Sequence, residues 1–87
     1  SDLEAISDYI AADNPLRAIS FVEEIAARFD TIAERPLTFP LNADLPPPYR
    51  SALHGKYRII FHLVEDVPHI VRVAHGARDI VSLLTDE

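Results

Sequence analysis

The first part of the chain carries apolar residues at helical spacing. Within residues 2–12 they recur every three or four positions, which predicts a short helix with one buried stripe. The stripe consists of Leu3, Ile6 and Ile10, with Ala5 and Tyr9 beside it. The DNP sequence at 13–15 then predicts a break, because proline disfavours helix in the residue before it and suits a first helical turn. Asp13 or Asn14 is expected to cap the helix that follows.

A second, longer helix is predicted from Pro15 to about Arg35, ending before Pro36. Its expected buried side comprises Leu16, Ile19, Val22, Ala26, Phe29 and Ala33, widened by Ala18, Ile25 and Ile32. Two consecutive helices with a tight joint predict an antiparallel hairpin whose apolar stripe needs a cover. Residues 36–48 hold five of the seven prolines and no periodicity, so they are interpreted as a connector rather than a proline-rich docking ligand.

After the prolines, β-branched and aromatic residues predict three antiparallel strands. The runs are 49–53, 56–64 and 69–75, separated by a His54-Gly55 turn and by the EDVP turn at 65–68. Gly76 is expected to end the last strand, and residues 77–84 read as a short C-terminal helix or an extended tail. The predicted fold class is therefore α+β, one domain over 1–87 in which a helical hairpin packs on a three-stranded antiparallel sheet.

An even-numbered loop at 65–68 predicts the register of the last two strands. It places Arg58 opposite His75, Ile60 opposite Val73 and His62 opposite Val71. The expected core face carries Tyr57, Ile59, Phe61, Leu63, Ile70 and Ala74, and the other face carries Arg58 and His75. Arg72 falls on the apolar side in this register, so it must reach solvent at an edge, pair with an acid or mark a bulge.

The composition of the chain limits the classes of function that it can have. A net charge of −6 weighs against a protein that grips nucleic acid through long-range attraction. No apolar run is long enough to span a membrane, and the absence of cysteine favours a reducing cytoplasm. The four histidines have no metal-ligand spacing, and the serines have no nucleophile-elbow context. We therefore expect no cofactor and no metal.

Arg58, with His75 and Arg78 from the sequence VAHGARDI at 73–80, is the one group with an obvious chemical use. A guanidinium holds an anion and an imidazole exchanges a proton near neutral pH. The alternative is that these are ordinary strand residues, whose arginines pair with carboxylates on an acidic surface.

Several segments together resemble the RelE/ParE superfamily of type II toxins, and more closely its ParE branch. They include Asp2-Leu3 with Ile6 and Tyr9, Asn14-Pro15, Arg50, Tyr57-Arg58, and His75 with Arg78, spread over nearly the whole chain. The resemblance implies two helices on an antiparallel sheet. The family has a further strand before the first helix, so we expect that strand to be missing from residues 1–87, which would leave a sheet edge open to another chain.

RelE-type members are ribosome-dependent endoribonucleases, and the resemblance would put Arg58, His75 and Arg78 at the scissile phosphate. The only lysine is Lys56, however, and no tyrosine follows Tyr57, which favours binding over cleavage. The resemblance thus implies a ParE-like toxin of a plasmid-stabilisation module that poisons DNA gyrase by binding, using Arg50, Arg58, His75 and Arg78. The alternatives are a RelE-like mRNA endoribonuclease and a non-toxic, complex-forming member of the same fold.

The resemblance also implies a partner, a cognate ParD-like antitoxin that holds the toxin inactive. Exposed apolar residues of the helical hairpin, or an open strand edge, are the expected docking surface. Acidic antitoxin tails would meet Arg17, Arg28, Arg35 or Arg50. No membrane and no direct nucleic-acid binding are expected for the toxin alone.

Overall fold

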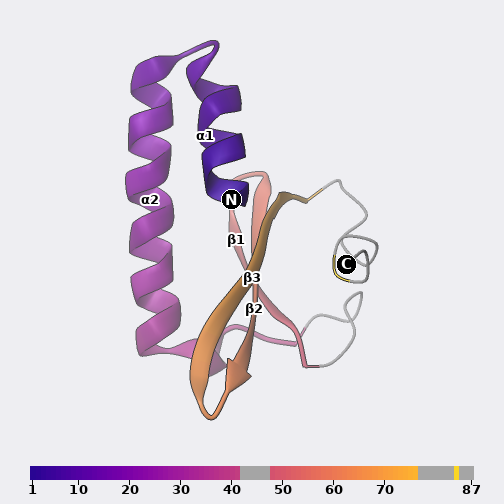
Figure 1. The fold of residues 1–87 in the computed structure, drawn as a ribbon. Helices are drawn as coiled ribbons and strands as arrows, with labels where there is room; N and C mark the ends of the chain where they lie inside the picture. The colour runs from indigo at the N-terminus through magenta and orange to yellow at the C-terminus, as the bar shows by residue number, and fades with distance from the viewer. Residues whose placement is uncertain (42–47, 77–83, 85–87) are drawn as a thin grey trace.

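The computed structural model describes residues 1–41, 48–76 and 84, which form two helices packed on one sheet (Figure 1). Its elements are α1 (Asp2–Ala11), α2 (Pro15–Glu34), the 3-10 turn η1 (Pro36–Thr38), β1 (Arg50–His54), β2 (Tyr57–Val64) and β3 (Val67–His75). The α+β prediction is confirmed. The middle of the predicted connector, 42–47, and most of the predicted C-terminal helix or tail, 77–83, lie outside the described residues.

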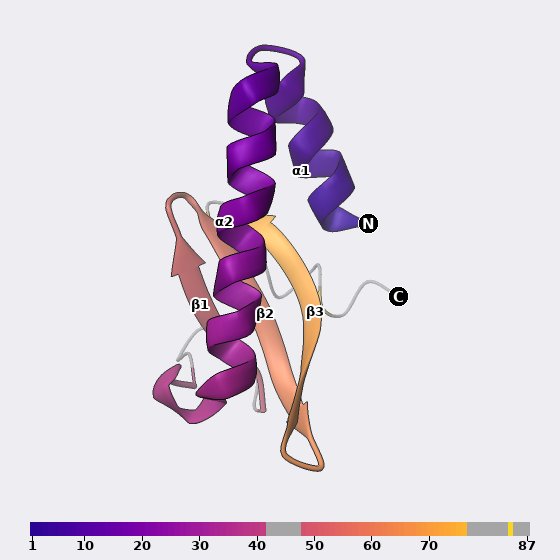
Figure 2. The same cartoon turned by 90° about the vertical axis from the view of Figure 1, so that its left-hand side faces the viewer.

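Capping side chains begin both helices of the hairpin. Ser1 Oγ accepts the backbone N–H of Glu4, and Asn14 Oδ1 accepts that of Arg17 at 3.1 Å. Pro15 then occupies the first turn of α2, where its missing N–H costs nothing. The tight joint turns the chain back, so that α1 and α2 lie side by side as predicted (Figures 1 and 2).

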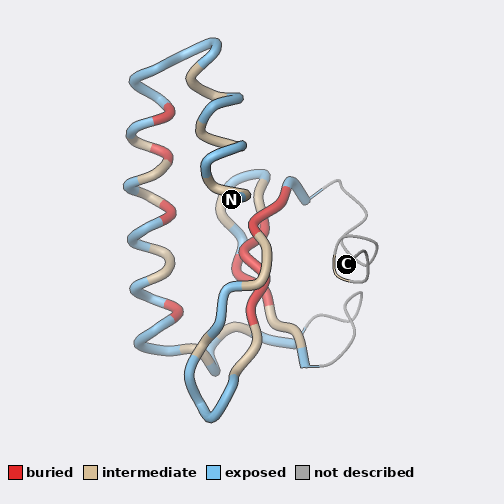
Figure 3. Tube along the Cα trace, viewed as in Figure 1, coloured by how far each residue is buried: buried red, intermediate tan, exposed pale blue. Residues whose placement is uncertain are grey.

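The buried face of α2 agrees only in part with the predicted stripe. Ala18, Ile25 and Ile32 are buried as predicted. Leu16 and Ile19 are 79% and 59% exposed, whereas Phe21, which was not predicted to be buried, is 2% exposed. The four buried residues of the helix are Ala18, Phe21, Ile25 and Ile32, and the buried segments of α2 lie on the side that faces α1 and the sheet (Figure 3). Helix α2 carries apolar residues on more than one side, so periodicity alone could not choose the side that the sheet covers.

The sheet is antiparallel with the order β1-β2-β3, and α2 crosses one of its faces (Figure 2). The face that α2 covers, here the inner face, forms the main core together with α2. This core holds Phe21, Ile25, Ile32, Ala52, Ile59, Phe61 and Val73. The other side, here the outer face, has a smaller buried cluster of Ile60 and Ala74, against which Tyr49 and Leu84 pack. The predicted inward direction of Tyr57, Ile59, Phe61 and Leu63 is confirmed.

Both turns are shorter or shifted relative to the prediction. The β2–β3 turn contains only Glu65 and Asp66, at φ 52° and 68°, so β3 already begins at Val67. Two left-handed residues make a tight hairpin turn that usually carries asparagine or glycine, and this sequence has neither there. The β1–β2 turn is Gly55-Lys56, with Gly55 at φ 58°. A glycine suits that position because a side chain would be strained there.

The register of β2 and β3 corrects the predicted pairing. Near the turn Phe61 pairs with Ile70, and beyond a bulge Ile60 pairs with Arg72. Farther along, Tyr57 pairs with His75 and Arg58 pairs with Ala74. Because successive side chains alternate between faces, this one-residue shift moves His75 and Ala74 to the faces opposite those predicted.

Asp2 joins α1 to β3 and is the acidic partner of Arg72. The Arg72 side chain donates to both Asp2 oxygens, at 2.8 and 3.0 Å, and the Val73 backbone N–H donates to Oδ2 at 2.9 Å. Two of the three outcomes considered for Arg72, a bulge and an acid partner, therefore occur together. Burial alone would raise the pKa of Asp2, but the hydrogen bonds from Arg72 and Val73 and the Arg72 charge outweigh it and leave the pKa below 3.8.

The Asp2→Asn variant should be less stable than wild type by about 1 kcal/mol at pH 7, because a half-buried charged hydrogen-bond pair is lost. A lowered folded-state pKa stabilises the protein fully above the unfolded value of 3.8, and this contribution disappears as the pH falls through the folded value. Urea denaturation at pH 7 and at about pH 3 checks this. A difference between wild type and variant that is equally large in acid would contradict the role given to the Asp2 charge.

Candidate functional site

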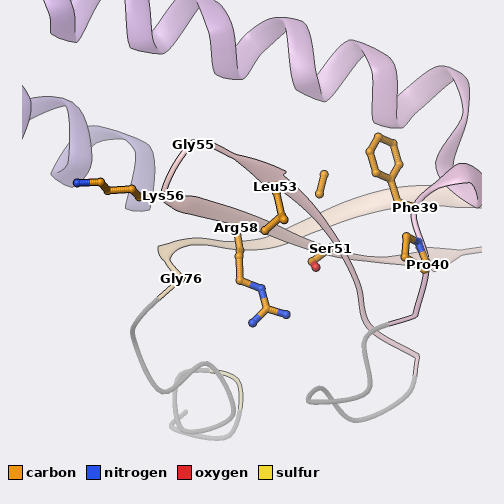
Figure 4. A pocket seen from close by; sticks show the side chains of 9 residues that line it. Phe39, Pro40, Ser51, Leu53, Gly55, Lys56, Arg58 and Gly76 are labelled. Atoms are coloured by element: carbon orange, nitrogen blue, oxygen red, sulfur yellow. The ribbon is translucent and has the colours of Figure 1, made fainter.

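One cavity of the described residues opens on the outer face, and Arg58 is among the residues that line it. It has a volume of about 620 Å³ and is here called the outer groove. Its lining residues are Phe39, Pro40, Ser51, Ala52, Leu53, Gly55, Lys56, Arg58 and Gly76. Figure 4 shows the Arg58 side chain leaving the sheet on the side away from α2, while Lys56 extends from the turn at the end of the groove.

Strand register places these side chains together. Leu53 pairs with Arg58 and Ser51 pairs with Ile60, so Ser51, Leu53 and Arg58 share the outer face. The Gly76 N–H donates to the Lys56 carbonyl at 2.7 Å, which brings the end of β3 against the turn. A Cβ at Gly76 would lie 3.3 Å from that carbonyl oxygen, so the close approach favours glycine.

The described residues that line the outer groove differ in charge from the chain as a whole. The charged ones among them are Lys56 and Arg58, although the chain carries a net charge of −6. Arg58 is only 8% exposed, whereas Leu53 is 66% exposed beside it. A guanidinium at the base of an open groove with an apolar rim suits recognition of an anionic or hydrogen-bond-accepting group on a partner.

His75 lies on the opposite face of the sheet from Arg58. The His75 ring packs against Tyr57 with their centroids 5.6 Å apart, and Tyr57 packs against the core on the inner face. His75 instead lines a separate cavity of about 380 Å³ between α1 and β3, together with Tyr9 and Tyr57. The predicted pairing of Arg58 and His75 on one face is therefore wrong, because the bulge and the tight hairpin turn shift the register by one residue.

The other two predicted site residues have different positions. Arg50 donates from Nη1 to the Phe39 carbonyl at 2.8 Å, and so anchors the chain beside the groove wall formed by Phe39 and Pro40. Its guanidinium is thus engaged in the fold. Arg78 lies outside the described residues.

Sequence reasoning missed a polar cluster where α2 meets the β1–β2 turn. Glu24 accepts from Arg17 at 2.6 Å, and its other carboxylate oxygen lies 2.8 Å from His54 Nε2. The hydrogen bonds from Arg17 and then from His54 hold the pKa of Glu24 below its ordinary 4.5, against a smaller opposing effect of burial. The same contact with Glu24 raises the pKa of Arg17. Glu24 and His54 stand 30 residues apart, so no local pattern could have connected them.

The described residues contain neither a metal site nor a membrane-spanning helix. Across 1–41, 48–76 and 84, no group of three or more histidine, cysteine or acidic side chains could hold a metal ion. None of the described helices is long and apolar enough to cross a membrane.

The chain matches the model of a known protein family. The model of a family described as "ParE toxin of type II toxin-antitoxin system, parDE" matches residues 1–80. No curated protein matches the chain.

Proposed function

Because the chain belongs to the ParE toxin family of type II toxin–antitoxin systems, we propose that it acts in the cytoplasm by binding DNA gyrase through the outer groove. Family membership gives the toxin role and implies an antitoxin partner. The target, the binding surface and the absence of hydrolytic chemistry are our proposal. In this proposal Arg58 is the main residue that contacts gyrase, and Lys56 adds a second positive charge at the end of the groove.

One observation carries the preference for binding over RNA cleavage. Arg58 and His75 lie on opposite faces of the sheet, since their pairing partners are Ala74 and Tyr57. An acid–base group must lie within hydrogen-bond reach of the atoms it serves, together with the group that stabilises the phosphate. Their separation argues against a shared phosphate, while a cation-lined groove needs only Arg58 and its neighbours to bind a protein surface.

The cognate antitoxin is proposed to dock on the other side of the molecule. Tyr9, Leu16 and Ile19 of the helical hairpin are 78%, 79% and 59% exposed. Large apolar side chains that the fold leaves in water are typical of a docking surface. An antitoxin segment with apolar side chains at helical spacing would cover them.

Two parallel assays test the target. Purified protein is expected to bind gyrase in a calorimetric titration, and to leave mRNA intact when it is added to translating ribosomes and the transcripts are mapped by primer extension. Codon-linked mRNA cuts without gyrase binding would overturn the proposal and support the endoribonuclease alternative. Neither binding nor cuts would support a non-toxic, complex-forming member of the fold.

A further inference from the structure

Helix α2 holds the β1–β2 turn through two neighbouring contacts on one side of the helix. Glu24 Oε1 lies 2.8 Å from His54 Nε2, and Arg28 Nη2 donates to the Leu53 carbonyl at 2.9 Å. Residues four apart on a helix share a side, so Glu24 and Arg28 reach consecutive residues of β1. The end of that strand is thereby fixed to the helix.

Glu24 is itself held in place. Arg17, about two helical turns earlier, donates to both carboxylate oxygens of Glu24, at 2.6 and 3.2 Å. Arg17 also lies over the ring of Phe21, 5.8 Å from the centroid, and His54 packs edge-on against the same ring at 5.9 Å. Phe21 is 2% exposed, so the cluster rests on a rigid part of the core.

The turn that this cluster fixes belongs to the outer groove. Gly55 and Lys56 follow His54 directly and line the outer groove, and they also line a cavity of about 320 Å³ beside Arg17 and His54. On the other side, the Lys56 carbonyl accepts the Gly76 N–H. The turn is therefore held by α2 at one end and by the end of β3 at the other, and its position sets where Lys56 presents its charge.

We propose that Glu24 is a positioning residue for the outer groove, which fixes Lys56 for target binding by anchoring His54. This inference rests on the proposed function, because it assigns the groove to target recognition. Glu24 hydrogen-bonds with Arg17 and His54, neither of which lines the groove, so Glu24 acts through the turn. A side chain that holds a binding loop in its bound geometry lowers the ordering cost of association.

Amide hydrogen exchange tests the anchoring without any target. In Glu24→Ala, exchange at the turn, measured at the Gly76 amide that donates to the Lys56 carbonyl, is expected to accelerate about tenfold, because the turn loses one of its supports. Glu24→Gln keeps an acceptor for His54 and should retain part of the protection. Glu23→Ala removes the same charge from the exposed neighbouring position and should leave exchange at the turn unchanged. Equal exchange in the Glu24 and Glu23 variants would overturn the proposal.

Gyrase titration tests the consequence for binding. Glu24→Ala is expected to weaken binding about fivefold, and by less than about twofold when Lys56 is already replaced by alanine, because Glu24 acts through Lys56. A merely structural Glu24 would weaken both backgrounds equally, and that result would overturn the positioning role. If wild-type protein does not bind gyrase, the proposed function fails, and the exchange experiment alone decides whether Glu24 anchors the turn.

Discussion

Replacing Ile25 with alanine is expected to lower the free energy of unfolding by about 2–5 kcal/mol. Ile25 is 0% exposed and lies in the main core between α2 and the sheet. Truncation removes buried methyl groups and leaves a cavity that close-packed neighbours fill only in part. A domain of this size has about 5–15 kcal/mol of stability in total, so the loss is a large part of it.

Ile19→Ala provides a matched control on the same helix. Ile19 is 59% exposed, so the same truncation should cost less than about 1 kcal/mol. Urea denaturation of the two variants at one pH measures both effects. A cost at Ile19 equal to that at Ile25 would show that α2 buries the stripe predicted from periodicity, and that its packing differs from the structure.

Replacing Arg58 with alanine is expected to weaken gyrase binding by at least tenfold, or about 1.4 kcal/mol. Arg58 is the buried cation at the base of the outer groove, and arginines at the centre of an interface contribute more than charges at its rim. Arg58→Lys keeps the charge and loses the planar fork of donors, so an intermediate affinity is expected.

The control for Arg58 is Arg35→Ala. Arg35 is exposed at the C-terminal cap of α2 and does not line the outer groove, so its removal changes net charge equally and should alter affinity by less than about twofold. Thermal denaturation monitored by circular dichroism establishes that each variant is folded at the temperature of the titration. Equal affinities of folded Arg58 and Arg35 variants would remove the outer groove from target recognition.

The elements of the fold could be predicted from the sequence because each has a local cause. Asn14-Pro15 begins α2, Pro36 follows its end, and apolar and β-branched residues define the strands. The buried side of α2 could be predicted only in part, because its apolar residues surround much of the helix. The side is decided by contacts with Ala52, Ile59 and Phe61, which are distant in the chain.

The candidate site could be predicted only in part. Arg58 was identified correctly as an outward-facing residue, because the alternation of β2 is a local property. Its relation to His75 depends on a turn at Glu65-Asp66 and on a bulge at Val71, neither of which has a sequence pattern of its own. The cluster of Glu24 and His54 depends on the packing of α2 over β1, and that is a tertiary contact.

The most direct measurement is the conversion of supercoiled plasmid to linear DNA by gyrase, as a function of toxin concentration. Poisoning through the outer groove predicts that wild-type protein yields linear DNA only when gyrase is present. Arg58→Ala should require at least about tenfold more protein, whereas Arg35→Ala should match wild type. Folded wild-type protein that yields no linear DNA, or an Arg58→Ala variant as potent as wild type, would contradict this mechanism.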